Sequence, residues 1–143
     1  MAETEKSALA RFDGFVPERA AIEAYGNGGF RFAGMSHRGS LLVLADGMHA
    51  WPGASSLMSS CTLSNVTVDL SAVLVAVLEH LAAPQFLLLG TGIKQIFPEA
   101  NVRAVFGARG IGIEAMDTGA ACRTYNILLA EHRPVMAALM AVA

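Results

Sequence analysis

The chain has 143 residues, of which 54% are hydrophobic and only 15% are charged, and its net charge is −2. This length predicts one domain with a single core, and the low charge, against roughly 25% in an average soluble domain, indicates a large interior. Only two of its ten basic residues are lysines. The chain therefore lacks the diffuse positive charge that nucleic-acid binding depends on, and we expect no nucleic-acid partner.

Membrane insertion and export are not predicted either. The longest wholly apolar runs, residues 72–78 and 134–143, fall short of the roughly 18 residues that a spanning helix needs. The start, M-A-E-T-E-K-S-A-L-A-R-F-D-G-F, has no apolar signal core and no arginine-rich import pattern. We expect residues 1–14 to be a disordered leader and residues 15–143 to be one domain. The expected location is the cytoplasm, free or peripheral to the inner membrane.

The first half of the domain has the pattern of β-hairpins. Glycine-rich or Asp-Gly turns separate short strands, and Pro52 and Gly53 end the series. The predicted strands are residues 20–25, 30–33, 40–45 and 48–51. The Ser- and Thr-rich residues 54–65 predict a loop, with one short strand at 61–63. Asp69 then caps a buried helix that runs to about residue 83.

The second half predicts strand, helix, strand and helix in succession, as in parallel α/β sheets. The expected elements are a central strand at 85–90, a helix at 99–109, a strand at 111–116 and a closing helix capped by Asp117 or Thr118. Pro134 breaks or kinks that helix. The apolar tail beyond it, read as a continuation of the helix, closes over the core or forms a partner surface, and we favour core closure.

Two loops could form a binding site, because ligands of open α/β sheets lie beyond the carboxyl ends of the strands. The loops contain Gly90, Thr91 and Gly92, and Asp117, Thr118 and Gly119. If their strands are neighbours, the loops share a rim that also receives Cys122 and Arg123 and could hold a carboxylate or phosphate. The alternative is that the glycines only serve turns, since a lone G-T-G matches no nucleotide-binding motif.

The closing helix raises the question of a reactive thiol. At 100° per residue, Cys122 and Tyr125 share the inward side with Leu128, while Arg123 and Ile127 point away. Catalysis at Cys122 would need a base, but the candidate histidines are isolated in the sequence: His37, His49, His80 and His132. We expect His37 and His49 to be turn or surface residues and not ligands. We treat Cys61 and Cys122 as free thiols, and predict no catalytic residue, metal site or cofactor.

Tyr125 and Asn126 follow Cys122 on this helix, and each has a structural role available. The tyrosine ring can pack on the sheet, and the asparagine amide can bond a loop carbonyl. We favour these structural roles over the alternative, in which both residues are part of the rim.

Three stretches together resemble a known family: G-G-F-R-F-A-G, L-L-L-G-T-G and D-T-G-A-A-C-R-T-Y-N-I-L-L-A-E-H-R. The resemblance is to the small Mth938-like single-domain family, which includes the mitochondrial assembly factor 3 of respiratory complex I, and it covers residues 15–138. It implies a three-layer α/β fold with a mixed central sheet and no established enzymatic activity. By position, the family motif falls on Gly90, Thr91, Gly92, Asp117, Thr118, Ala121, Cys122, Thr124, Tyr125 and Asn126, extended by Glu131 and Arg133.

The resemblance implies a function as well as a fold. It implies a non-catalytic assembly or adaptor factor for a respiratory or other membrane protein complex, whose partners are complex subunits or a second assembly factor. The chain departs from the family in carrying Pro134 where a second basic residue is common. The alternative function is a small-molecule or anion-binding protein, or an enzyme, that uses the Gly90–Gly92 loop and the helix N-terminus at Thr118.

Overall fold

The computed structural model describes residues 14–16, 18–51, 86–98 and 100–143. The predicted leader up to residue 13, the loop at 54–65, its strand at 61–63 and the helix from Asp69 lie outside these residues. Within them the first half forms β1 (Gly14–Val16), β2 (Ile22–Gly26), β3 (Gly29–Phe32), β4 (Met35–Arg38), β5 (Leu41–Leu44) and β6 (Gly47–Ala50). The second half forms β7 (Phe86–Gly90), α4 (Ala100–Ala108), β8 (Gly112–Met116), α5 (Thr118–Ala130) and β9 (Met136–Leu139).

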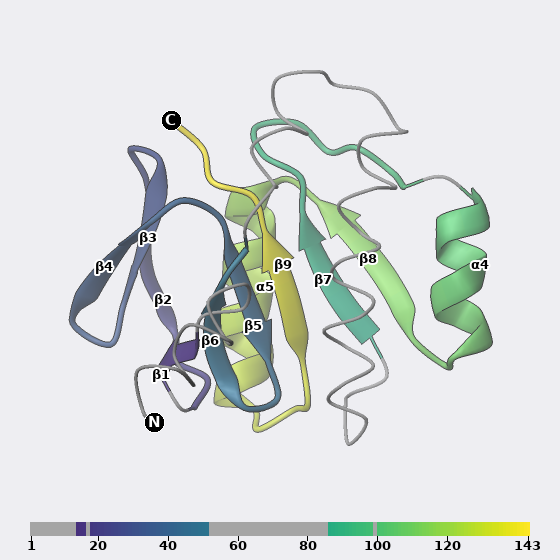
Figure 1. The fold of residues 1–143 in the computed structure, drawn as a ribbon, viewed down its shortest axis with the longest axis horizontal. Coiled ribbons are helices and arrows are strands. Elements are labelled where there is room, and N and C mark those ends of the chain that lie inside the picture. Colours follow the sequence, from purple (N-terminus) through teal and green to yellow (C-terminus); the bar gives the residue numbers. More distant parts are fainter. Residues whose placement is uncertain (1–13, 17, 52–85, 99) are drawn as a thin grey trace, which may run out of the picture.

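The strands form two sheets (Figure 1). The larger is a mixed six-stranded sheet in the order β1-β6-β5-β9-β7-β8, and the smaller is β2-β3-β4. β7 pairs in parallel with both β8 and β9, whereas β5 pairs antiparallel with β6 and β9. The predicted parallel pair on either side of the second-half helix is confirmed, and so is the mixed α/β fold.

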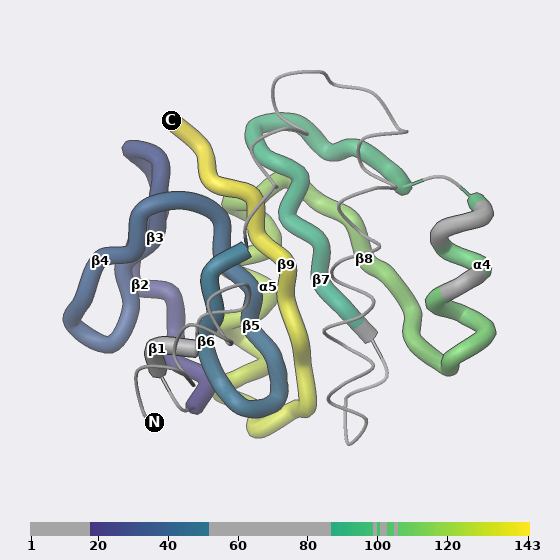
Figure 2. The backbone as a smooth tube through the Cα atoms, in the orientation of Figure 1, coloured from purple at the N-terminus to yellow at the C-terminus, as the bar shows by residue number. Residues whose placement is uncertain are grey.

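The apolar tail is a strand and not the predicted continuation of the last helix. β9 inserts between β5 and β7 at the centre of the large sheet, as Figure 2 shows. α5 stops at Ala130, and His132 takes a positive φ of 59°, so the chain has left the helix before Pro134. The run Met136–Leu139 is buried throughout. Such an unbroken apolar run is typical of a strand covered on both faces.

The large sheet has a separate hydrophobic cluster on each face. On one face, Leu42, Leu87 and Met136 pack with Phe106 of α4. On the other, Leu41 and Leu88 pack with Tyr125 of α5 and with Phe30 and Phe32 of the small sheet. This alternation gives three layers: α4, the six-stranded sheet, and α5 beside the three-stranded sheet. No helix among the described residues combines the length and the apolar character needed to span a membrane.

The three-stranded sheet is a double hairpin with two tight turns. Asn27-Gly28 and Ala33-Gly34 all have positive φ, which is the signature of type I′ turns between antiparallel strands. The second turn, which we did not predict, creates β4. The first turn is tied to the end of the chain, because the N–H of Gly28 donates to the carbonyl of Val142 at 2.7 Å.

Candidate functional site

The two predicted loops do meet at the carboxyl ends of β7 and β8. The N–H of Thr118 donates to the carbonyl of Gly92 at 2.8 Å, and the N–H of Gly92 donates to the Thr118 hydroxyl at 2.9 Å. The N–H of Thr91 donates to the carbonyl of Met116 at 2.9 Å. We call the residues of the two loops, Gly90–Gly92 and Asp117–Gly119, the rim.

The polar groups of the rim bond to one another and to the neighbouring backbone. The Thr91 hydroxyl donates to the carbonyl of Lys94 at 2.6 Å and accepts from the N–H of Ile96 at 3.0 Å. The Thr118 hydroxyl donates to the carbonyl of Met140 at 2.8 Å. Both threonines are buried. A buried hydroxyl that already has both a donor and an acceptor partner has little left to offer a ligand.

Each glycine of the rim has a structural reason. A Cβ on Gly90 would lie 3.1 Å from a methyl carbon of Leu139 and 3.2 Å from the Cα of Thr118, closer than side chains normally approach. Gly92 has a φ of 93°, which other residues rarely adopt. The G-T-G motif therefore serves close packing and a turn.

The start of α5 is capped from within the chain. Asp117 accepts the N–H of Ala120 at 2.9 Å, which satisfies one free donor of the first turn and places a negative charge at the positive end of the helix dipole. Tyr25 of the small sheet lies directly over Gly119, and a Cβ at that position would collide with its phenol oxygen. The helix N-terminus is thus covered on one side by protein.

Cys122 and Arg123 face opposite ways, as the helical geometry predicted. Cys122 is buried, and this burial raises the pKa of its thiol from 9.0 to about 12, although the nearby Arg123 charge partly opposes the shift. A thiol with so high a pKa is not a reactive thiolate at neutral pH. Arg123 is exposed to solvent and has no ion-pair partner within the described part of the chain.

Tyr125 and Asn126 connect α5 to the segment that enters the small sheet. The Tyr125 hydroxyl donates to the carbonyl of Ala20 at 2.8 Å, and burial raises the pKa of this phenol. The Asn126 amide accepts the N–H of Ile22 at 2.8 Å and donates to the carbonyl of the same residue at 2.9 Å. These contacts support the structural role that we favoured for both residues.

Two hydrophobic side chains stand out on the surface beside the rim. Ile93 is 76% exposed and Phe97 is 58% exposed, and both lie in the segment that follows β7. The segment is nonetheless fixed, because Thr91 bonds Lys94 and Ile96 and the Gln95 amide donates to the carbonyl of Ala115 at 2.7 Å. We did not single out these residues from the sequence. The signal was present, since I-K-Q-I-F places apolar residues in a loop that should be polar.

The described histidines do not gather at the rim, and His80 lies outside the described residues. His37, predicted as a turn or surface residue, lies in β4, and its Nε2 is 3.0 Å from the carbonyl of Ser40. His49, for which we made the same prediction, is instead buried in β6 with its Nε2 2.6 Å from Asp46. The described residues contain no group of three or more His, Cys, Asp or Glu side chains that could hold a metal ion.

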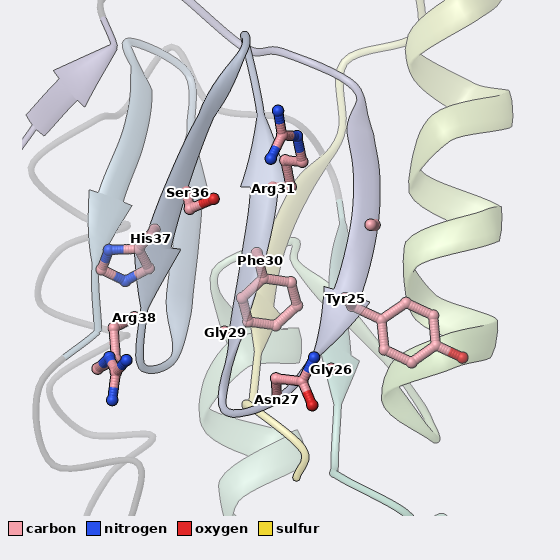
Figure 3. Close-up of a pocket in the computed structure, with 10 residues that line it drawn as sticks. Tyr25, Gly26, Asn27, Gly29, Phe30, Arg31, Ser36, His37 and Arg38 are labelled. Carbon is pink, nitrogen blue, oxygen red and sulfur yellow. The ribbon is translucent and has the colours of Figure 1, made fainter.

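A hollow of about 370 Å³ opens on the three-stranded sheet, away from the rim. Residues of all three strands line it, among them Arg31, Ser36 and Arg38 (Figure 3). In Figure 3, Tyr25 points from β2 toward α5, away from Ser36 and Arg38. Our reading of the sequence missed this hollow because it missed β4. The Ala33-Gly34 turn after F-R-F was the signal that could have revealed it.

Comparison with known proteins places the chain in a family. The family described as "Protein of unknown function (DUF498/DUF598)" matches residues 22–140. NADH dehydrogenase [ubiquinone] 1 alpha subcomplex assembly factor 3 from Danio rerio is 34% identical over 122 residues, which are 83% of this chain and 63% of that protein.

Two solved structures agree with this assignment. One, described as an outer membrane protein from Bartonella henselae, is 38% identical with a TM-score of 0.69, and the match covers 89% of this chain and 98% of that one. The other, described as a Mth938-like domain from Bordetella pertussis, is 28% identical with a TM-score of 0.62 over 85% of each chain. The chain therefore belongs to the DUF498/DUF598 family and has the Mth938-like fold.

Proposed function

We propose that this protein is a non-catalytic assembly or adaptor factor that binds protein subunits of a membrane complex, of the complex I type or another. The observation that carries the proposal is the contrast at the rim. The rim hydroxyls are engaged in internal hydrogen bonds and the thiol of Cys122, one turn further along α5, is buried, while Ile93 and Phe97 beside the rim are exposed on a fixed segment. Exposed apolar side chains on an ordered loop are more useful for protein contact than for chemistry.

The names of relatives support the same class of function. The Danio rerio relative is named as an assembly factor of NADH dehydrogenase. We extend this class of role to the present chain as a proposal. We propose that the protein acts in the cytoplasm, free or peripheral to the inner membrane, while the membrane complex is being assembled. The alternative, anion binding at the rim through Thr91, Thr118 and Arg123, has less support, because both threonine hydroxyls have internal partners and only Arg123 has none among the described residues.

The test is capture of partners with a tagged full-length chain from its native host, after crosslinking, followed by mass spectrometry. The native chain is expected to recover subunits of a membrane complex or a second assembly factor. The double variant Ile93→Ser/Phe97→Ser is expected to lose most of this recovery while keeping its melting temperature.

Ile127→Ser is the matched control, because Ile127 is 59% exposed but lies on the outer side of α5. It should leave recovery unchanged. Failure of the native chain to recover any membrane-complex component would count strongly against the proposal. So would stabilisation of the native chain by millimolar phosphate, nucleotide or carboxylate that Arg123→Ala abolishes, since that result would favour the anion-binding alternative.

A further inference from the structure

The hollow on the three-stranded sheet has a charge opposite to that of the whole chain. The chain carries a net charge of −2, yet the described residues that line the hollow include two arginines and no acidic side chain. The ligand that such a lining favours is an anion, because a guanidinium matches the planar geometry of a carboxylate or phosphate.

The strand register brings the polar side chains of the hollow to one face. Arg31 lies opposite Ser36 and Ala24, and Arg38 lies opposite Gly29. Since side chains alternate along a strand, these residues share the face opposite Phe30 and Phe32, which are buried against the core. The face thus presents two guanidiniums and a hydroxyl above a floor of glycine and alanine.

Both guanidiniums are available to a ligand. Arg31 approaches Glu23 at 3.6 Å, with the two side chains 58% and 47% exposed. An exposed ion pair of this kind contributes at most about 1 kcal/mol and is easily exchanged for another. Arg38 is exposed, and within the described part of the chain it has no ion-pair partner.

The strand beside the hollow also offers backbone groups. β4 is the edge strand of its sheet, with no described strand on its outer side. The two-residue turn at Ala33-Gly34 makes Phe32 and Met35 a hydrogen-bonded pair, so Ser36 and Arg38 turn their N–H and C=O groups away from β3. An edge of this kind can pair with an extended peptide.

We propose that the three-stranded sheet binds an extended acidic segment of a partner protein. The segment pairs along the outer edge of β4 and places successive acidic side chains on the sheet face that carries Arg31, Ser36 and Arg38. A free small anion would satisfy only the guanidiniums, whereas an acidic strand uses both the charges and the open edge. The inference rests on the proposed protein-binding function for its ligand class, but it concerns a surface separate from Ile93 and Phe97.

A defined peptide tests this inference without knowledge of the natural partner. The probe is a ten-residue peptide with blocked ends and alternating Glu and Thr, titrated into the full-length protein by calorimetry and by NMR. Binding should shift the amide signals of Ser36 and Arg38. Arg31→Gln and Arg38→Gln should each weaken binding by about tenfold, as expected for loss of a charged hydrogen bond. Arg103→Gln, at an exposed position on α4, should leave it unchanged.

Two modified probes separate charge from backbone pairing. A peptide with Gln in place of Glu should lose binding, and so should the acidic peptide methylated on alternate backbone nitrogens. The proposal is overturned if the native chain does not bind the acidic peptide, if either modified peptide binds as well, or if inorganic phosphate binds as tightly. None of these outcomes depends on Ile93 or on a membrane complex, so they leave the capture experiment to decide the proposed function.

Discussion

The rim and the hollow both combine glycines with polar side chains, but the polar groups are used in opposite ways. At the rim, Thr91 and Thr118 are buried, and their hydroxyls join the loops of the parallel strands to each other and to the backbone after β9. On the three-stranded sheet, Arg31, Ser36 and Arg38 are exposed above a hollow. The polar groups of the rim hold parts of the fold together, whereas those of the hollow face solvent.

This difference indicates that a polar side chain can serve a binding site only if it still has a donor or acceptor that is not used within the fold. The rim has the location at which α/β proteins usually bind ligands. In this chain the carbonyl of Met140, just after β9, accepts the Thr118 hydroxyl, and Asp117 accepts the N–H of Ala120 at the start of α5. The small sheet has no such customary role, but within the described part of the chain its two arginines have no partner stronger than the exposed Arg31–Glu23 pair.

The largest change in unfolding free energy is expected from alkaline pH, through the buried side chains of Cys122 and Tyr125 on α5. Burial raises the pKa of the Cys122 thiol from 9.0 to about 12 and also raises the pKa of the Tyr125 phenol above its ordinary value of 10.0. Both neutral forms are therefore favoured in the folded state. Their stabilisation is complete below pH 9 and is lost as the pH rises through the folded pKa values, by up to about 1.4 kcal/mol per pH unit for each group.

Urea denaturation between pH 7 and pH 11 measures this loss. The unfolding free energy should be flat up to about pH 8.5 and should then fall. Cys122→Ala should make the fall shallower. An unfolding free energy that stays constant to pH 11, or an equal slope in the variant, would show that these groups are not buried as described.

The next largest effect is expected at the rim itself. Thr118→Val keeps the shape of the side chain but leaves the carbonyl of Met140 and the N–H of Gly92 without their partner. Because both groups are buried, the loss should be about 2 to 4 kcal/mol in unfolding free energy, measured by urea denaturation. Thr124→Val is the control, since among the described residues its hydroxyl makes only a 3.6 Å contact with the sulfur of Met116. Equal losses in the two variants would show that the hydrogen bonds of Thr118 do not hold the rim together.

The smallest effect on stability is expected at the hollow. Arg31→Gln and Arg38→Gln each remove an exposed charge, so each should change the unfolding free energy by no more than about 0.5 kcal/mol in the same measurement. Their effect should appear in binding of the acidic peptide instead. A loss as large as that of Thr118→Val would mean that these arginines hold the fold together, and the comparison between the two regions would fail.

Local patterns predicted most of the second half of the fold. The strand–helix–strand–helix order, the neighbouring parallel strands, the cap at Asp117 and the inward side of α5 at Cys122 and Tyr125 all agree with the structure. These features depend on periodicity and on residues next to each other in the chain. The tail could not be assigned in this way, because an alanine-rich apolar run suits both a buried helix and a central strand.

The sequence predicted that the two loops meet, but it did not predict that their polar groups are occupied by partners within the fold. The sequence placed Gly90–Gly92 beside Thr118, and the hydrogen bonds between them agree. Whether the rim binds a ligand stays a prediction. The sequence alone could not say that Met140, 22 residues after Thr118, would accept its hydroxyl, since that contact depends on β9 entering the centre of the sheet.

By itself the sequence determined the α/β class, the Asn27-Gly28 turn and the inward and outward sides of α5, because each of these follows from short-range spacing and residue type. The family and the mixed sheet came from the resemblance of three sequence motifs to a known family. Only the tertiary structure decided that β9 completes the large sheet, that the threonines of the rim are occupied, and that the arginines of the small sheet are open. The physical reason is that hydrogen-bonding capacity is consumed by partners distant in the chain. Which polar groups remain for a ligand is therefore fixed only when those distant segments meet.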